Sequence, residues 1–228
     1  MSVIIEAKDI YKEYRTSSGI VYAINGINVA LEKEGFYVII GKSGSGKSTL
    51  LHILSGLDKP TKGEVFVAGE NLYEKTDEEM SVFRRRQIGF VFQQYNLIED
   101  YDVVTNICMP MKLDKQNPDM DFVKEVAKIL GISQKLKKYP AELSGGEQQR
   151  VAIARSIAAK PQIIFADEPT GNLDKKTGEE TLALLKECSR NFGQTLIIVT
   201  HDLEIAKEAD AVYEIEDGKL STKIFFSE

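Results

Sequence analysis

The sequence contains little cysteine, no long apolar run and no excess of positive charge. Its two cysteines, Cys108 and Cys188, lie far apart without metal-ligand spacing, so we expect two buried or partly buried free thiols in a reducing compartment. Nowhere do about 18 apolar residues follow one another, which excludes a membrane-spanning helix. The formal net charge of −6 argues against a sequence-independent nucleic-acid binder, because such proteins usually carry a basic face.

The remaining composition is that of an ordinary globular protein, with 43% hydrophobic and 28% charged residues. A chain of 228 residues can bury a sizeable core in one or two lobes. Because Lys8 and Asp9 follow only a short apolar start, no signal peptide is predicted. We therefore expect a cytoplasmic protein that associates with a membrane only through a partner.

A glycine-rich stretch joins an apolar run, residues 36–40, to a helical pattern that begins near Leu50. The pattern G-x-x-x-x-G-K-S between a strand and a helix is typical of a phosphate-binding loop. The glycines let backbone N–H groups turn towards a polyphosphate, and the helix start adds unpaired N–H groups. We expect Lys47 to reach the β- and γ-phosphates and Ser48 to place its hydroxyl on Mg²⁺. The loop residues assigned to the nucleotide are Gly41, Ser43, Gly44, Ser45, Gly46, Lys47, Ser48 and Thr49.

A pair of acidic residues, Asp167 and Glu168, follows another apolar run at residues 163–166. The pair thus lies at the carboxyl end of a predicted strand, the edge of an open α/β sheet where ligands bind. We expect Asp167 to hold Mg²⁺ through water, and Glu168 to reach a water that attacks the γ-phosphate. The alternative is a polar strand end before a turn at Pro169, and the phosphate loop argues against it.

Two further polar residues follow predicted strands. His201 comes after the apolar run at residues 196–200, and Gln93 comes after the run at residues 88–92. The amide of Gln93 could reach Mg²⁺ or the attacking water. Taken alone, neither residue distinguishes a nucleotide site from an ordinary surface or capping role.

The stretch at residues 143–147, Leu-Ser-Gly-Gly-Glu, opens another predicted helix and provides a second anion site. One chain rarely folds two such loops onto one phosphate group. A head-to-tail pair solves this problem, because each copy's Ser-Gly-Gly then covers the nucleotide held by the other copy's Lys47. Ser144 and Glu147 also have the spacing of a capping box, and the two interpretations can hold at once.

Apolar periodicity predicts an α/β protein. The predicted strands cover residues 4–14, 21–31, 36–40, 63–69, 88–92, 163–166, 196–200, 212–216 and 220–226. After the loop helix, the predicted helices cover residues 77–85, 101–113, 119–130, 146–159 and 177–192. Asp77 is the expected N-cap of the first of these. The continuous apolar strands are typical of a parallel sheet that is buried on both faces.

Together these motifs resemble the nucleotide-binding subunit of ATP-binding cassette (ABC) transporters, in their order and spacing over essentially the whole chain. The matching segments are Walker A at residues 41–48, the Q-loop at Gln93, the signature at residues 143–147, Walker B at residues 163–168, the D-loop at residues 171–174 and the switch histidine at His201. Tyr14 falls where the family stacks an aromatic ring on adenine, and Tyr11 is the other candidate.

The resemblance implies one cassette, residues 1–228, with a P-loop NTPase core of mixed, mainly parallel sheet. The core and an antiparallel β subdomain would occupy about residues 1–93 and 161–228, and a helical subdomain with the signature about residues 94–160. ATP and Mg²⁺ are the implied cofactors. Catalytic roles fall to Lys47, Gln93, Glu168 and His201, and metal contacts to Ser48, Gln93 and Asp167. The other nucleotide contacts fall to Tyr14, the loop residues, Asp174 and, from the second copy, Ser144, Gly145, Gly146 and Glu147.

Residues 58–61, 90–97 and 167–174 look closest to the subgroup of macrolide and antimicrobial-peptide exporters and lipoprotein-releasing ATPases. The implied partners are a second copy or a related cassette and a multi-span membrane permease, with no nucleic acid, at the inner face of the cell membrane. The implied cargo is a peptide, drug or lipoprotein-like molecule, moved by export. Glu147 in the signature and the pair Gly171-Asn172 in the D-loop differ from the commonest residues of the family. We expect such variants in working members.

Other classes share single features of this sequence. A GTPase switch has the phosphate loop, but no N-K-x-D occurs here, and a small-molecule kinase would not need residues 143–147. A cytosolic ABC ATPase of DNA repair, translation or cofactor assembly is the serious rival. The long insertions or second cassette of the repair and translation members are not present. A cassette that drives a membrane complex without transport would look the same in sequence.

Overall fold

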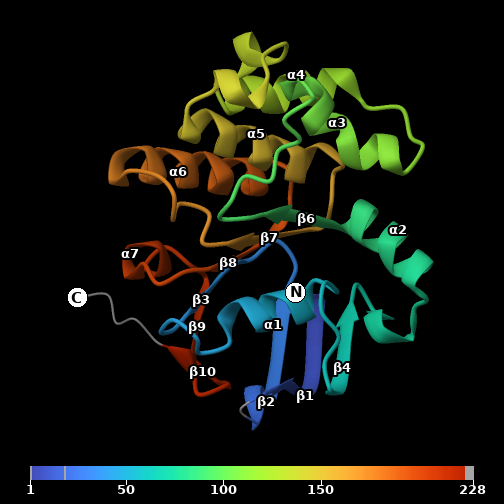
Figure 1. Cartoon of the computed structure of the whole chain (residues 1–228), viewed down its shortest axis with the longest axis vertical. Helices are drawn as coiled ribbons and strands as arrows, with labels where there is room; N and C mark the ends of the chain where they lie inside the picture. Colours follow the sequence, from blue (N-terminus) through green and yellow to red (C-terminus); the bar gives the residue numbers. More distant parts are fainter. Residues whose placement is uncertain (1, 18, 224–228) are drawn as a thin grey trace. The chain divides into compact units, whose positions relative to one another are not determined.

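The structure is a computed structural model that describes residues 2–17 and 19–223, and it separates into two compact units (Figure 1). Unit 1 is formed by residues 1–80 and 197–228, and unit 2 by residues 81–196. Two elements cross the boundary, α2 (Asp77–Gln87) and β8 (Thr195–Val199). The order of elements, with strands and helices interspersed along the chain, confirms the predicted α/β class.

Unit 1 holds the amino-terminal strands, the phosphate loop and the last strands of the chain. Its elements are β1 (Val3–Thr16), β2 (Gly19–Glu32), β3 (Phe36–Ile40), α1 (Lys47–Leu54), β4 (Lys62–Val67), β5 (Glu70–Asn71), η1 (Leu72–Glu74), α7 (Leu203–Ala206), β9 (Ala211–Glu216) and β10 (Lys219–Lys223). Four of these strands form an antiparallel sheet in the order β2-β1-β4-β5. On β1, Ile5 lies opposite Leu31 of β2 and Val67 of β4, and all three side chains are buried. This face of the sheet is therefore part of the core of unit 1.

The rest of unit 1 is built on β3, the strand that feeds the phosphate loop. β9 pairs with β3 in parallel, β10 pairs with β9 antiparallel, and residues 197–199 of β8 lie on the other side of β3. The N–H of Thr200 donates to the carbonyl of Ile39 at 3.1 Å. Asp217 and Gly218, both with positive φ, form the tight turn between β9 and β10 that the sequence predicts.

Unit 2 packs helices on a short parallel sheet. Its elements are β6 (Ile88–Val91), α3 (Val103–Leu113), α4 (Met120–Ile129), η2 (Ser133–Lys135), η3 (Pro140–Glu142), α5 (Gly145–Ala158), β7 (Ile163–Asp167) and α6 (Lys175–Asn191). β6 and β7 run parallel, and residues 195–196 of β8 follow next to β7. α5 contacts α3, α4, α6 and β6, and its residues 151–154 are completely buried (Figure 1). The helix that begins at the signature is thus the central helix of unit 2.

The predicted elements are found, with boundaries shifted by at most three residues, and α7 and β5 were not predicted. The expectation that Asp77 caps α2 is wrong. The hydroxyl of Thr76 accepts the N–H of Glu79 at 3.3 Å, and the carboxylate of Glu79 accepts the N–H of Thr76 at 2.8 Å. Thr76 and Glu79 thus form a capping box, and Asp77 lies inside the first turn. The predicted strand at residues 220–226 ends as β10 at Lys223, and residues 224–226 lie outside the described part of the chain.

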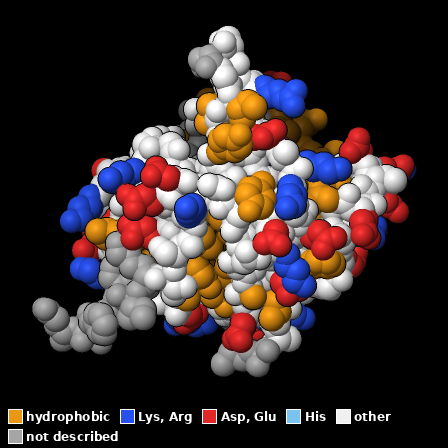
Figure 2. All heavy atoms as spheres, turned by 90° about the horizontal axis from the view of Figure 1, so that it is seen from below, with side chains coloured by type: hydrophobic (Ala, Val, Ile, Leu, Met, Phe, Trp, Pro, Cys, Tyr) orange, Lys and Arg blue, Asp and Glu red, His pale blue; other side chains and the backbone are white. Residues whose placement is uncertain are grey.

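Cys108 and Cys188 are buried free thiols, as predicted, and burial raises the pKa of Cys188 to about 12. Within residues 2–17 and 19–223, no helix combines the length and the apolar character needed to cross a bilayer. Figure 2 shows acidic, basic and hydrophobic side chains interspersed on the face that it presents.

Candidate functional site

The phosphate loop of unit 1 leaves no room for side chains at two of its glycines. A Cβ on Gly46 would lie 2.4 Å from the carbonyl oxygen of Ala23, and a Cβ on Gly41 would lie 2.4 Å from that of Ile215. Both glycines also have φ between +100° and +160°, a region that L side chains rarely adopt. The glycines that the motif requires are therefore explained by backbone conformation and by close packing of the loop.

The first residues of α1 offer positive groups that a phosphate can use. Gly46 is the N-cap and has no side chain to accept the first N–H groups of the helix. Lys47 is buried, with a relative exposure of 8%, and its ammonium donates to the carbonyl of Lys42 at 2.9 Å. This acceptor is uncharged, so the bond does not neutralise the ammonium. An uncapped helix start beside a buried positive charge fits a triphosphate well.

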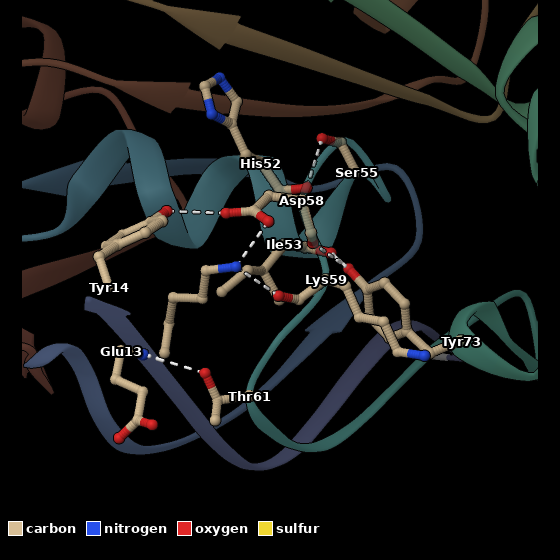
Figure 3. Close-up of polar contacts among 10 residues, drawn as sticks. Glu13, Tyr14, His52, Ile53, Ser55, Asp58, Lys59, Thr61 and Tyr73 are labelled. Atoms are coloured by element: carbon tan, nitrogen blue, oxygen red, sulfur yellow. Dashed lines mark hydrogen bonds and ion pairs between the residues drawn. The ribbon is translucent and has the colours of Figure 1, made fainter. Parts of the chain in front are cut away.

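Tyr14, rather than Tyr11, has its ring held next to the phosphate-loop helix. The Tyr14 hydroxyl donates to Asp58 at 2.7 Å (Figure 3) and has the Thr49 side chain as a second hydrogen-bond partner. Burial and the bond to Asp58 raise the pKa of Tyr14. Tyr11 instead packs on the backbone at Gly26, where a Cβ would lie 2.9 Å from its hydroxyl oxygen. Of the two tyrosines, Tyr14 has the placement expected of a base-stacking ring.

In unit 2, β7 ends at the predicted acidic pair. Asp167 is the last residue of the strand and is half-buried, and Glu168 follows with a φ of +44°. A left-handed conformation at a non-glycine residue is strained, and such strain is characteristic of functional sites. The N–H of Gly171 donates to the carbonyl of Glu168 at 3.0 Å and closes the turn.

The donor types at these positions fit Mg²⁺ held together with a nucleotide. Ser48 and Asp167 offer a hydroxyl and a carboxylate, and Gln93 offers an amide oxygen. Among the described residues, no three His, Cys, Asp or Glu side chains come together as a dedicated metal cage. Mg²⁺ typically takes one or two carboxylates, water and substrate phosphates rather than such a cage.

Gln93, two residues after β6, is hydrogen-bonded to the D-loop of the same unit. The amide nitrogen of Asn172 donates to the Gln93 carbonyl at 2.9 Å, and the Gln93 amide reaches Asn172 at 3.5 Å. A Cβ on Gly171 would lie 2.9 Å from the Gln93 amide nitrogen. The pair Gly171-Asn172, a departure that the sequence interpretation treated as minor, therefore contacts a predicted site residue directly.

The signature stretch forms a complete capping box at the start of α5. The Ser144 hydroxyl accepts the N–H of Glu147 at 3.3 Å, and the Glu147 carboxylate accepts the N–H of Ser144 at 2.8 Å. The bond from the Ser144 N–H, followed by that from Lys135 at 3.0 Å, lowers the pKa of Glu147. The predicted capping box is confirmed.

The two signature glycines are needed for packing inside unit 2. A Cβ on Gly145 would lie 2.7 Å from the hydroxyl oxygen of Tyr95, and a Cβ on Gly146 would lie 2.5 Å from Cγ2 of Thr177. Neither glycine has a positive φ, so close approach rather than backbone conformation requires them. The signature thus packs against the Q-loop segment and against α6.

Two further predicted site residues, Asp174 and His201, lie at or near the starts of helices. Asp174 is the N-cap of α6, and hydrogen bonds from the side chain and then the backbone of Thr177 lower its pKa. His201 is exposed between β8 and α7, directly before Asp202, the N-cap of α7. Tyr14, the phosphate loop and His201 belong to unit 1, and the other predicted site residues belong to unit 2.

Sequence reasoning missed two residues of α5 that join the motifs of unit 2. Gln149 is completely buried and donates to the carbonyl of Pro169 at 2.6 Å, in the turn after Walker B. Arg155 donates to the carbonyls of Tyr95 at 2.9 Å and Asn96 at 2.5 Å. The available signal was a polar side chain on the otherwise apolar face of a predicted helix.

Comparisons with known proteins identify the family of this chain. The profile of the family described as ABC transporter matches residues 24–171. The lipoprotein-releasing system ATP-binding protein LolD of Acinetobacter baylyi is 42% identical over 221 residues, which cover 95% of this chain and 96% of that protein. An uncharacterised ABC transporter ATP-binding protein of Methanocaldococcus jannaschii is 43% identical over 218 residues, covering 95% and 97%.

Solved structures agree in fold as well as in sequence. The dimeric structure of the ATP-binding cassette MJ0796 in a post-hydrolysis state, bound to ADP and Pi, has a TM-score of 0.87 and 37% identity. The match covers 98% of this chain and 100% of that chain. With the phosphate loop, the acidic pair and the signature in place, this chain belongs to the ABC transporter family and is one of its ATPases.

Proposed function

We propose that this chain is the ATPase subunit of a membrane transporter and works as a head-to-tail dimer around two ATP molecules. The observation that carries the proposal is the start of α1, where the N-cap is a glycine, glycines constrain the backbone, and the buried ammonium of Lys47 is bonded to an uncharged carbonyl. The solved MJ0796 cassette is dimeric, which supports a dimeric assembly here.

Each site residue then has a role set by its chemistry. Lys47 and the N–H groups of α1 bind phosphate oxygens, and Ser48, Gln93 and Asp167 provide oxygen ligands for Mg²⁺. When bound, Mg²⁺ neutralises phosphate charge. Glu168 orients the attacking water and accepts its proton, and His201 contacts the γ-phosphate. Phosphoryl transfer needs positioning and charge neutralisation more than covalent chemistry, which fits this set of residues.

The second copy completes each site through its signature and D-loop. Ser144, Gly145, Gly146 and Glu147 of one copy would face the nucleotide bound by the other, with Asp174 nearby. The hydroxyl of Ser144 accepts a bond from its own helix but keeps its proton to donate. The second copy is either an identical chain or a related cassette.

We further propose that the dimer lies at the cytoplasmic face of the cell membrane, bound to a multi-span permease that exports its cargo. Relatives 39–42% identical to this chain are named lipoprotein-releasing system ATP-binding proteins. These names support a lipoprotein-like cargo over a drug or a peptide, and an antimicrobial peptide is among the less favoured cargoes.

The variant Glu168→Gln tests the catalytic proposal. It should bind ATP normally but lose on the order of 10²–10⁴ in turnover, the usual contribution of a general base. It should also accumulate as an ATP-bound dimer, measured by light scattering. The exposed Glu125 of α4 provides the matched control Glu125→Gln, which should keep wild-type turnover. A variant that stays monomeric with ATP and Mg²⁺ at high protein concentration would contradict the dimer.

Purification of the tagged chain from native membranes in mild detergent tests the partner. A co-purifying multi-span protein with a large extracytoplasmic domain is the expected result. Recovery of all ATPase activity in the soluble fraction, without a membrane protein, would instead favour a cytosolic ABC ATPase.

A further inference from the structure

The carboxylate of Asp58, just after α1, uses both of its oxygens within unit 1 (Figure 3). One oxygen accepts the Tyr14 hydroxyl at 2.7 Å, and the other accepts the Lys12 ammonium at 2.6 Å. Burial alone would raise the pKa of Asp58, but the bonds from Lys12 and Tyr14 hold it below its usual value. The ionised carboxylate is therefore the form that holds Tyr14.

Asp58 is itself fixed by its backbone. Its N–H donates to the carbonyl of His52 at 3.1 Å, in the last turn of α1, and its own carbonyl lies 2.7 Å from the Tyr73 hydroxyl (Figure 3). The Tyr14 hydroxyl has its second partner, Thr49, in the first turn of the same helix. Hydrogen bonds thus fix the position of the Tyr14 ring relative to both ends of α1, the helix that begins with the phosphate loop.

The ring of Tyr14 keeps surface for a ligand despite these bonds. Tyr14 is 39% exposed, although its hydroxyl is engaged. The Lys12 ammonium lies over the ring, 4.9 Å from its centroid, and occupies one face. A flat aromatic ligand would have to stack on the opposite face, at an angle that the hydroxyl bonds determine.

We propose that Asp58 is a positioning residue for the nucleobase, because it holds the Tyr14 ring in the orientation that stacks on adenine. Lys12 supports this role by anchoring the second carboxylate oxygen. The inference rests on the proposed ATP site, in which Tyr14 contacts the base. It assigns a function to a residue just beyond the carboxyl end of α1, at the opposite end of the helix from the phosphates.

Binding of ATP and of tripolyphosphate, which lacks a base, separates this role from a general effect on the loop. Tyr14→Phe keeps the ring and removes the hydroxyl, and Asp58→Ala removes the acceptor. Each variant should weaken ATP binding about 3- to 10-fold, the net effect of one hydrogen bond, and leave tripolyphosphate binding unchanged. The double variant should weaken ATP binding by less than the two single effects combined, because both substitutions remove the bond between Tyr14 and Asp58.

Three further variants make the result unambiguous. Asp58→Asn keeps an oxygen acceptor and should restore part of the ATP affinity. Glu64→Ala, an exposed carboxylate on β4, should leave both ligands unchanged. Lys47→Ala should weaken both ligands, because it removes a phosphate contact.

Either of two results would overturn the positioning role. The first is wild-type ATP affinity in Tyr14→Phe. The second is an equal loss of ATP and tripolyphosphate in Asp58→Ala, which would place the effect on the phosphate loop. In both cases the Lys47→Ala result would show that the proposed ATP site itself still stands. A wild-type chain that binds neither ligand would overturn the proposed function together with the inference.

Discussion

α1 and α5 both begin at a glycine-containing loop, yet they satisfy their first N–H groups in different ways. α1 has Gly46 as its N-cap, which has no side chain to bond the first N–H groups, and the buried Lys47 is its first residue. α5 has the reciprocal bonds of Ser144 and Glu147, and Lys135 pairs with that carboxylate. One helix start thus presents positive groups, whereas the other already holds an anion of its own.

This difference would allow one chain to carry the two proposed phosphate-binding motifs without competition between them. The start of α1 should bind a triphosphate by itself, since its N-cap is a glycine and its buried ammonium is bonded to an uncharged carbonyl. The Glu147 carboxylate at α5 repels a free phosphate, so α5 should contribute only when a nucleotide is presented to it. The proposed use of the signature across a dimer follows from this difference in capping.

The largest effect on stability is expected at Gly46, the N-cap of α1. Gly46→Ala brings a Cβ to 2.4 Å from the Ala23 carbonyl at a φ of +109°. Overlap and backbone strain should together lower the free energy of unfolding by about 3 kcal/mol. Gly44→Ala is the matched control, because no atom lies within 4 Å of its Cβ and strain alone, about 1 kcal/mol, applies. Equal losses in urea unfolding would show that the close approach is unimportant.

Lys47→Ala removes the charge that distinguishes α1 from α5. Its ammonium is bonded to an uncharged carbonyl, so its positive charge is available to phosphate. Loss of a charge-assisted contact should weaken ATP binding roughly 10- to 100-fold in calorimetry. Lys42→Ala, an exposed lysine of the same loop, is the control and should change affinity little. Similar losses for both lysines would mean that the net charge of the loop, not the position of Lys47, matters.

Ser144→Ala removes the cap of α5 and should separate stability from nucleotide affinity. Losing an N-cap hydroxyl costs about 1 kcal/mol of stability, seen as a lower urea midpoint. ATP affinity of the monomer should not change, because α1 binds the nucleotide. ATP-dependent dimerisation should decrease. A loss of monomer affinity would contradict the division of roles between the two helices.

Glu147→Gln tests the smallest difference, the charge within the capping box. The bond from the Ser144 N–H and the pairing with Lys135 lower the pKa of Glu147, so folding favours its ionised form. This stability is present above the unfolded pKa, about 4.3, and is lost as the pH falls through the lower folded pKa. Wild type should therefore lose more stability than the variant between about pH 6 and pH 3. Parallel curves of urea midpoint against pH would contradict this.

Much of the fold could be predicted because its signals are local. The strand at residues 36–40 was placed without error, since its apolar residues lie between Gly35 and Gly41, which define both ends. The cap of α2 was misplaced because Thr76 and Asp77 are both good capping residues, and only the bonds to Glu79 decide between them. The short α7 was missed because four residues show no helical period.

The candidate site was predictable where one motif carries the chemistry, as at Lys47 and Glu168. Contacts between distant segments were not predictable. Asp58 lies 44 residues from Tyr14, and Asn172 lies 79 residues from Gln93. Such pairs depend on strand pairing and loop packing rather than on any local pattern, so only the three-dimensional structure reveals them.

A complementation experiment tests most directly the claim that α1 binds the nucleotide in one copy and α5 acts from the other. Lys47→Ala and Ser144→Ala chains are each expected to have strongly reduced activity alone, and their mixture forms some dimers with one intact pair of α1 and α5. We predict that mixing the two singly substituted chains restores ATPase activity. Mixing wild type with a chain that carries both substitutions should not raise the activity, because the mixed dimers contain no intact pair of α1 and α5. If the two singly substituted chains keep their reduced activity when mixed, the two helices act within one copy and the account is contradicted.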